Sequence, residues 1–300
     1  MNRTLEIGMI GLDTSHATAF TELLNDIEHP YHVPGGQVVC AYPGGSPDVS
    51  FEYGRLDSHA RIVQEQYGVE IKQSIEEVAS EVDAILLESA DGRVHWEQFT
   101  RLAPFGKPIF IDKPLAVSLE DALKIRRLAK EYHVPVMSSS ALRYSSGLHK
   151  VLSSTEEAVS GVSCYGPMYI EPSQPGYFWY GIHTAEMLFR IMGPGCREVT
   201  VHAGGDHDQI IGAWNDGRIG TIRGFRSGVM GFGALLHRER HTELIDTTKD
   251  EQPFYAGLLE KVIKFFATGI PDVPLDETLE IIRFIEAAND SVKSGKTVTL

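Results

Sequence analysis

Near its start the chain reads Leu5-Glu6-Ile7-Gly8-Met9-Ile10-Gly11-Leu12-Asp13-Thr14-Ser15-His16. A short apolar run that ends in glycine and leads into helix-starting polar residues is typical of the first strand and helix of a parallel α/β sheet. Short apolar runs then alternate with longer amphipathic stretches as far as about residue 140, which is the pattern of consecutive βαβ units. We therefore expect a Rossmann-like, doubly wound parallel sheet in residues 1–140.

The elements expected in this first domain follow from that alternation. The six strands are predicted at 5–10, 37–42, 69–72, 84–87, 108–111 and 134–138, and the helices at 16–26, 58–67, 75–80, 92–103 and 119–132. The last helix has a capping residue, Ser118, and Asp121 lies near its positive end.

The pattern changes beyond Arg143, where we expect an α+β domain spanning 141–300. A helix is predicted at 180–191 and strands at 198–202, 209–214 and 219–225, the last two joined by the turn residues Asn215-Asp216-Gly217-Arg218. Two further helices, 253–267 and 275–292, precede a final strand at 297–300. We find no repeat or long linker, which predicts a compact junction between the domains.

The composition narrows the classes of function. The 300 residues carry a formal charge of −14, so the protein would repel nucleic acid and anionic membranes at long range. No apolar run is long enough for a transmembrane helix, and none near the start resembles a secretory signal. The three cysteines are far apart, which favours a reducing compartment. We expect a cytoplasmic protein that binds neither nucleic acid nor membrane.

The turn after the first strand only partly matches a dinucleotide fingerprint. Measured against G-x-G-x-x-G from Gly11, the second glycine is replaced by Asp13 and the third by His16. An aspartate adds bulk and negative charge where a pyrophosphate would approach. Asp13 could instead cap the helix with Thr14 or Ser15, and the residues leave both interpretations open.

The second strand ends without the carboxylate that would bind an NAD ribose. The residues that follow it are Pro43-Gly44-Gly45-Ser46, and Ser46 with the nearby Arg55 could contact a 2′-phosphate. This weakly favours NADP over NAD. A plain loop of turn residues explains the stretch equally well.

Several separated motifs resemble those of one family in order along the chain. Gly106-Lys107-Pro108-Ile109-Phe110-Ile111-Asp112-Lys113-Pro114-Leu115 resembles G-K-x-x-x-x-E-K-P-L, the signature of the glucose-fructose oxidoreductase, inositol dehydrogenase and rhizopine-catabolism (Gfo/Idh/MocA) family. His95, Arg143-Tyr144, Gly181-Ile182-His183-Thr184-Ala185-Glu186 and Ala288-Asn289-Asp290-Ser291 match further family positions. Trp179 stands where many members carry an aspartate that helps with proton transfer.

This resemblance implies a fold, a cofactor and an activity. It implies a Rossmann-like domain followed by an α+β domain with an open, mostly antiparallel sheet that forms the contact of a homodimer or homotetramer. It also implies NAD(P)-dependent oxidation or reduction of a sugar, polyol or related hydroxy compound. The residues assigned to cofactor binding are Gly11, Asp13, Thr14, Ser15, His16, Ser46, Ser89, His95 and Lys113.

The candidate catalytic residues are Lys113, His183 and Tyr180. Lys113 follows the fifth strand, where ligands collect in a doubly wound sheet. His183 can exchange a proton near neutral pH because the ordinary pKa of histidine is about 6.5. Tyr180 could donate a phenolic hydrogen bond or pack. Arg143, Trp179 and Glu186 are assigned to the substrate, although an inter-domain ion pair is the commoner use of an arginine such as Arg143.

Two alternatives keep the fold and change the function. His183 and Glu186, three residues apart on one helix face, could bind a divalent metal in a lyase, hydratase or epimerase that acts on a sugar derivative. A non-catalytic sugar sensor is the other alternative. The degenerate glycine fingerprint is the observation that keeps both of them open.

Overall fold

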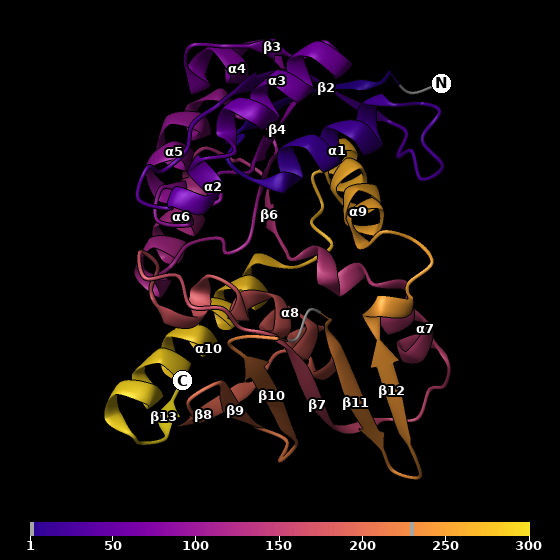
Figure 1. The fold of residues 1–300 in the computed structure, drawn as a ribbon, viewed down its shortest axis with the longest axis vertical. Coiled ribbons are helices and arrows are strands. Elements are labelled where there is room, and N and C mark those ends of the chain that lie inside the picture. Colours follow the sequence, from indigo (N-terminus) through magenta and orange to yellow (C-terminus); the bar gives the residue numbers. More distant parts are fainter. Residues whose placement is uncertain (1–2, 229–230) are drawn as a thin grey trace. The chain divides into compact units, whose positions relative to one another are not determined.

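The computed structural model describes residues 3–228 and 231–300 (Figure 1). The chain divides into two compact units. Unit 1 comprises residues 1–139 and 255–275, and unit 2 comprises residues 140–254 and 276–300. The predicted α/β class, with a parallel sheet followed by a mostly antiparallel one, is confirmed.

Unit 1 is built on a six-stranded sheet in the order β3-β2-β1-β4-β5-β6, in which every neighbouring pair is parallel. The strands are β1 (Leu5–Ile10), β2 (Gly36–Tyr42), β3 (Glu70–Ile71), β4 (Ala84–Leu87), β5 (Ile109–Ile111) and β6 (Val136–Ser138). The central strands β1, β4 and β5 are almost entirely buried, because helices cover both faces of such a sheet.

The helices of unit 1 fall into two packing groups. The helices are α1 (Ser15–Asn25), α2 (Ser50–Tyr53), α3 (Leu56–Tyr67), α4 (Ile75–Glu81), α5 (His95–Leu102), α6 (Leu119–Glu131) and α9 (Phe254–Thr268). Helix α1 packs on α3, while α5 contacts both α4 and α6. Ser118 caps α6 by accepting the Asp121 N–H, as predicted. Helix α5 begins at His95 rather than at Gly92, because residues 91–94 form a turn.

The two compact units differ from the predicted domains in one segment. Residues 255–275, which include nearly all of α9, belong to unit 1 although they follow most of unit 2 in the sequence. The Tyr255 ring packs against His16 and Phe20 of α1, and the side chain of Ile263 lies against Gly35 and Gly36 at the start of β2. Through these contacts α9 packs into the core of unit 1.

Unit 2 is built on a seven-stranded sheet in the order β12-β11-β7-β10-β9-β8-β13. The strands are β7 (Val159–Pro167), β8 (Cys196–Ala203), β9 (His207–Trp214), β10 (Ile219–Phe225), β11 (Gly233–Arg238), β12 (Thr242–Asp246) and β13 (Val298–Thr299). Among the strands of this sheet that the structure describes, only β7 and β10 pair in parallel. The predicted hairpin at residues 215–218 joins β9 and β10. The predictions for this half did not include β7, which is a central strand.

The helices of unit 2 are α7 (Ser146–Ser153), α8 (Gly181–Met192) and α10 (Leu275–Ser294). Helix α8 is nearly all buried and packs on β7 and β10, so it covers one face of the sheet. None of the helices in the described part of the chain has the length and hydropathy needed to cross a membrane.

Candidate functional site

Three neighbouring strands of unit 1 deliver polar residues to one edge of the parallel sheet. Strands β1, β4 and β5 are adjacent, and their carboxyl ends lie at the same edge, which is where doubly wound folds bind ligands. The chain continues from β1 into residues 11–16, from β4 into Glu88 and Ser89, and from β5 into Asp112 and Lys113.

Gly11 allows the ends of β1 and β4 to approach each other. Its φ is +93°, and a Cβ at this position would lie 2.3 Å from the Ser89 nitrogen. No other residue type fits there, because the left-handed conformation and the backbone contact both exclude a side chain. The first glycine of the partial fingerprint thus has a structural role in this protein.

Asp13 turns into the protein instead of capping α1. Its carboxylate is fully buried and accepts the Ala90 N–H at 3.2 Å. Burial raises the pKa of Asp13 above its ordinary value, and the hydrogen bond only partly offsets this. The helix is capped by Thr14, whose Oγ1 accepts the His16 N–H at 3.3 Å. The cap interpretation is therefore wrong for Asp13 and correct for Thr14, while Ser15 is exposed at the first turn.

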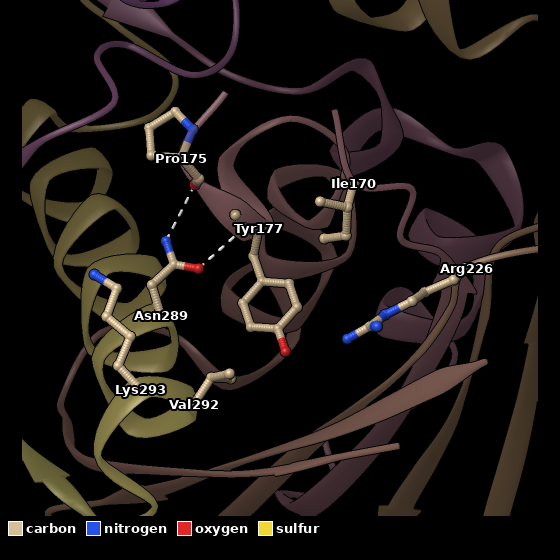
Figure 2. A pocket seen from close by; sticks show the side chains of 8 residues that line it. Ile170, Pro175, Tyr177, Arg226, Asn289, Val292 and Lys293 are labelled. Atoms are coloured by element: carbon tan, nitrogen blue, oxygen red, sulfur yellow. Dashed lines mark hydrogen bonds between the residues drawn. The ribbon is translucent and has the colours of Figure 1, made fainter. Parts of the chain in front are cut away.

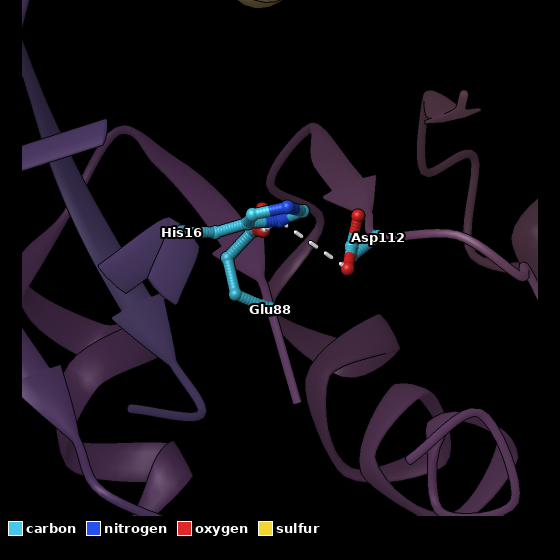
Figure 3. Close-up of side chains that lie close together, drawn as sticks. All are labelled: His16, Glu88 and Asp112. Atoms are coloured by element: carbon cyan, nitrogen blue, oxygen red, sulfur yellow. Dashed lines mark hydrogen bonds and ion pairs between the residues drawn. The ribbon is translucent and has the colours of Figure 1, made fainter. Parts of the chain in front are cut away.

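His16 lies between two carboxylates. Its Nδ1 is 3.2 Å from Glu88 Oε2 and 3.4 Å from Asp112 Oδ2, and all three side chains are buried (Figure 3). Burial lowers the pKa of His16, but Asp112 and other acidic neighbours more than compensate, and the pKa lies well above the ordinary value. Burial, followed by repulsion from Asp112, raises the pKa of Glu88 to about 7. For Asp112 the His16 and Lys113 cations overcome burial, and the pKa is lowered.

Lys113 extends this cluster toward the surface. Its Nζ is 3.3 Å from Asp112 Oδ2, its side chain is 15% exposed, and the Lys113–Pro114 peptide bond is cis. Burial lowers the pKa of Lys113, but the attraction of Asp112 outweighs it and the pKa is raised. Lys113 is therefore a cation at neutral pH. Its partner occupies the glutamate position of the family signature.

His95 and Ser89 brace the loops behind this edge. The fully buried His95 ring has Nδ1 3.0 Å from the Pro114 carbonyl oxygen and Nε2 2.9 Å from the Ser89 carbonyl oxygen. The Ser89 hydroxyl accepts a hydrogen bond from Gln98 at 2.9 Å. Both residues predicted to bind the cofactor thus connect the turns that follow β4 and β5, and their polar atoms have partners inside the protein.

A pocket of about 190 Å³ opens beside the end of β2. It is lined by Tyr42, Gly44, Gly45, Ile75, Val94, Glu97, Gln98 and Arg101. The residues from α5 were not predicted, although the i, i+3 and i+4 spacing of Val94, Glu97, Gln98 and Arg101 could have shown that they share a helix face. Ser46 and Arg55, which the sequence suggested as contacts for a 2′-phosphate, are not exposed to this pocket. Ser46 is buried, and the Arg55 guanidinium is paired with Glu52 and stacked on Phe51.

The pocket beside β2 fits the nucleoside of a pyridine nucleotide, and the start of α1 fits its phosphates. The pocket at Gly44 and Gly45 has the position that a nucleoside occupies in a doubly wound fold, and the first turn of α1 offers backbone N–H groups at Thr14 and Ser15. The inward-turned Asp13 carboxylate keeps its charge out of that turn.

In unit 2 a second group of candidate residues surrounds His183. The His183 Nδ1 is 2.8 Å from the Ser140 hydroxyl, which fixes the orientation of the ring. The Tyr180 ring meets His183 edge-on at 5.2 Å and stacks over Phe232 at 6.4 Å. Trp179 is partly exposed at the end of a short 3-10 helix, Gly176–Phe178. Ser140 and Phe232 were not predicted, because they are far from His183 in the sequence.

Arg143 and Glu186 form a buried ion pair. Arg143 Nη1 donates to Glu186 Oε2 at 3.0 Å, and its Nη2 is paired with Glu277. Burial raises the pKa of Glu186 to about 7, although Arg143 opposes the shift. Arg143 thus forms an ion pair, as one interpretation of the sequence expected, but its partners Glu186 and Glu277 lie in the same unit rather than in the other domain. The two residues of the alternative metal pair have separate partners in this structure, Arg143 for Glu186 and Ser140 for His183.

A larger pocket of about 460 Å³ lies elsewhere in unit 2 (Figure 2). Its wall is mostly apolar, and Asn289 holds the loop above it by accepting the Tyr177 N–H and donating to the Pro175 carbonyl. Tyr177 donates to Asp208, which also pairs with Arg226. Ser291, from the same A-x-x-S motif, bonds Val201 N and the Lys296 carbonyl, so the motif serves the packing of α10.

Comparison with known proteins identifies the first unit. The model of the oxidoreductase family with an NAD-binding Rossmann fold, Gfo/Idh/MocA, matches residues 5–140. The match covers slightly less than half of the chain, from the start of β1 to the residues after β6. The resemblance inferred from the sequence is confirmed, and the match includes the β1 turn, Glu88, Asp112 and Lys113.

The individual proteins that this chain resembles have low sequence identity to it. An uncharacterized oxidoreductase from Streptococcus pneumoniae serotype 4 is 25% identical over 179 residues, which are 51% of this chain and 48% of that protein. The chain thus spans about half the length of that relative. Several solved structures share the fold over nearly the whole length, including the following two. A myo-inositol 2-dehydrogenase from Lactobacillus plantarum has a TM-score of 0.79, 15% identity, and coverage of 99% and 100%. The UDP-N-acetylglucosamine 3-dehydrogenase from Acidithiobacillus ferrooxidans has a TM-score of 0.80, 12% identity, and coverage of 98% and 99%.

Proposed function

We propose that this protein is an NAD(P)-dependent oxidoreductase acting on a sugar, polyol or related hydroxy compound. The observation that carries the proposal is Lys113, held by Asp112 at the carboxyl end of β5 in a domain of an NAD-binding oxidoreductase family. The fold is shared with an inositol dehydrogenase and a sugar-nucleotide dehydrogenase, and the hydroxylated ring common to their substrates suggests the substrate class.

Gly44, Gly45, Gln98 and Arg101 would hold the nucleoside part of the cofactor, and Thr14 and Ser15 its phosphates. When bound, the nicotinamide supplies a hydride acceptor or donor. The choice between NAD and NADP stays open. The NADP preference inferred from the sequence is weakened by the buried Ser46 and the paired Arg55.

The cationic Lys113 would donate a hydrogen bond to the oxygen of the reacting carbon. Asp112 keeps the ammonium charged and aimed, and a charged donor favours the form in which that oxygen carries negative charge. His183, with its ring oriented by Ser140, is the proposed proton acceptor and donor. Tyr180 and Trp179 would contribute a donor and an aromatic wall for a sugar ring.

The direct test combines nucleotide binding with turnover. NADH and NADPH binding would be measured by calorimetry, followed by assays on a panel of inositols, aldoses and sugar nucleotides. We expect Lys113→Met to lower kcat by roughly 10²- to 10⁴-fold, the usual range for loss of a positioned acid or base. Lys107→Met removes a lysine from the same motif and should leave kcat within about twofold. Failure of both nucleotides to bind at millimolar concentration would reject the redox function.

The cytoplasmic location and the homo-oligomer also remain proposals. Support for an oligomer comes from the outer face of the unit 2 sheet, where Ile219, Leu235 and Leu244 are 54%, 42% and 56% exposed. Leu235 and Leu244 are direct cross-strand partners, so they form one continuous apolar surface.

A further inference from the structure

We propose that His16, Glu88 and Asp112 bind a divalent transition-metal ion in unit 1. The three residues come from separate parts of the sequence and meet because β1, β4 and β5 are neighbours in the sheet. Figure 3 shows their side chains converging from the start of α1 and from the ends of β4 and β5. The proposal goes beyond the redox function and does not depend on it.

The spacing of the donor atoms suits a coordinated ion. One imidazole nitrogen and one oxygen from each carboxylate lie within 4.8 Å of one another. His16 Nδ1 lies 3.2 Å from Glu88 Oε2 and 3.4 Å from Asp112 Oδ2, and both distances are longer than the roughly 2.7–2.9 Å of a good charge-assisted hydrogen bond. With bonds of about 2.1 Å, ligand atoms would be about 3.0 Å apart at right angles and about 3.4 Å apart in a tetrahedron.

Unsatisfied oxygens provide a second, independent observation. Among the described residues, Glu88 Oε1 and both carboxylate oxygens of Asp112 have no hydrogen-bond partner, and the two residues are at most 1% exposed. A buried carboxylate oxygen without a partner is costly, because it has lost its hydration and gained nothing in return. A cation bound in bidentate fashion by the two carboxylates would satisfy Glu88 Oε1 and Asp112 Oδ1 as well as the Oε2 and Oδ2 atoms that face His16.

The surrounding residues are arranged as supports for metal ligands. The His16 ring is stacked on Phe20 at 4.9 Å and meets Tyr255 edge-on at 5.0 Å, which fixes its plane. Lys113 lies 3.3 Å from Asp112, in the position of an outer partner that orients a ligating carboxylate.

The donor set indicates the class of ion. One imidazole and two carboxylates suit Zn²⁺, Mn²⁺, Co²⁺ or Fe²⁺ better than Mg²⁺ or Ca²⁺, which prefer oxygen ligands alone. Three protein ligands leave at least one position open, so the ion could bind water or an oxygen atom of a ligand.

The alternative is a closed ion-pair cluster in which the His16 and Lys113 cations balance the two carboxylates. The test uses tag-free protein dialysed against chelator and then titrated with Zn²⁺ or Co²⁺. Stoichiometry is measured by elemental mass spectrometry and affinity by calorimetry. We expect one ion per chain and, with Co²⁺, visible absorption bands from a nitrogen and oxygen ligand set. Metal addition should also raise the melting temperature of the stripped protein.

Substitution of each proposed ligand tests whether the ion binds at this site. His16→Gln, Glu88→Gln and Asp112→Asn should each weaken binding by more than the roughly 10- to 100-fold that loss of an outer partner costs. His241 provides a matched control, because its ring is 3.4 Å from Glu157 and 3.5 Å from Glu243 but is 44% exposed. His241→Gln should bind one ion with wild-type affinity.

Two outcomes would overturn the proposal. One is a stripped wild-type protein that takes up less than about 0.2 ion per chain and melts at the same temperature with and without metal, which is the result expected of a closed ion-pair cluster. The other is unchanged affinity in a folded His16→Gln variant, which would mean that the ion binds elsewhere. Circular dichroism of each variant establishes that it is folded, and the wild-type melting shift remains informative if a variant is not.

Discussion

Several ionisable side chains of this protein are buried away from water. Glu186 is one of them, because it is 1% exposed and its carboxylate is paired with Arg143. Burial dominates this residue and raises its pKa to about 7 in spite of the arginine. The folded protein therefore holds a proton on Glu186 at pH values where an unfolded chain, with an ordinary pKa near 4.5, has released it.

This difference predicts how Glu186 affects stability with pH. Because the folded state binds more protons than the unfolded state between about pH 4.5 and 7, the contribution of Glu186 to the free energy of unfolding is fully present below pH 4.5 and falls as pH rises to 7. Urea unfolding of wild type and Glu186→Gln at pH 5, 6, 7 and 8 measures it. The wild-type advantage should shrink as pH rises, and an advantage that grows with pH would contradict the prediction.

At the scale of elements, the ends of β1 and β4 are held together by a contact that only glycine permits. Gly11 combines a positive φ with a backbone neighbour at 2.3 Å from the position of a Cβ. Gly68, which ends α3, also has a positive φ of 69°, but a Cβ there would meet nothing within 4 Å. A side chain at Gly11 would therefore meet both backbone strain and a steric clash, whereas a side chain at Gly68 would meet backbone strain alone.

We expect Gly11→Ala to lower the free energy of unfolding by about 3 kcal/mol, the sum of backbone strain and overpacking. Gly68→Ala should cost only about 1 kcal/mol, because strain alone applies. Chemical denaturation of both variants measures the difference. Equal losses in the two variants would show that the β1–β4 contact adjusts without cost.

At the scale of the whole molecule, the exposed apolar face of the unit 2 sheet is the feature that favours association. One face of this sheet is covered by α8, and the other presents Ile219, Leu235 and Leu244 to solvent. An apolar surface on a regular sheet is suited to pairing with a second copy through a two-fold axis.

A charge placed on that face should dissociate the oligomer. Leu244→Lys is expected to convert a dimer or tetramer to a smaller species in sedimentation velocity at micromolar concentration, because a buried lysine would be unpaired at the contact. Ile270→Lys changes an apolar residue that is 72% exposed in unit 1 and should leave the sedimentation coefficient unchanged. A monomeric wild-type protein would contradict the proposed oligomer.

Local pattern in the sequence predicted most of the elements, because strand and helix periodicity reflect which side chains each element buries. The runs at β1, β4 and β10 were predicted with their exact bounds, and the Lys113 motif identified the family. Strand β7 was not predicted, since its Val159-Ser160-Gly161-Val162-Ser163-Cys164-Tyr165 run is neither strongly apolar nor cleanly alternating.

The amino-acid sequence alone determined the class of fold, the family and the residues available for chemistry. Tertiary structure determined the partners of these residues: Arg143 pairs with Glu186, and Ser140 forms a hydrogen bond with His183. It placed α9 in unit 1. It also brought His16 to Glu88, 72 residues away, and to Asp112. The physical reason is that periodicity records burial within one element, whereas the meeting of these side chains depends on which strands lie next to each other in the sheet.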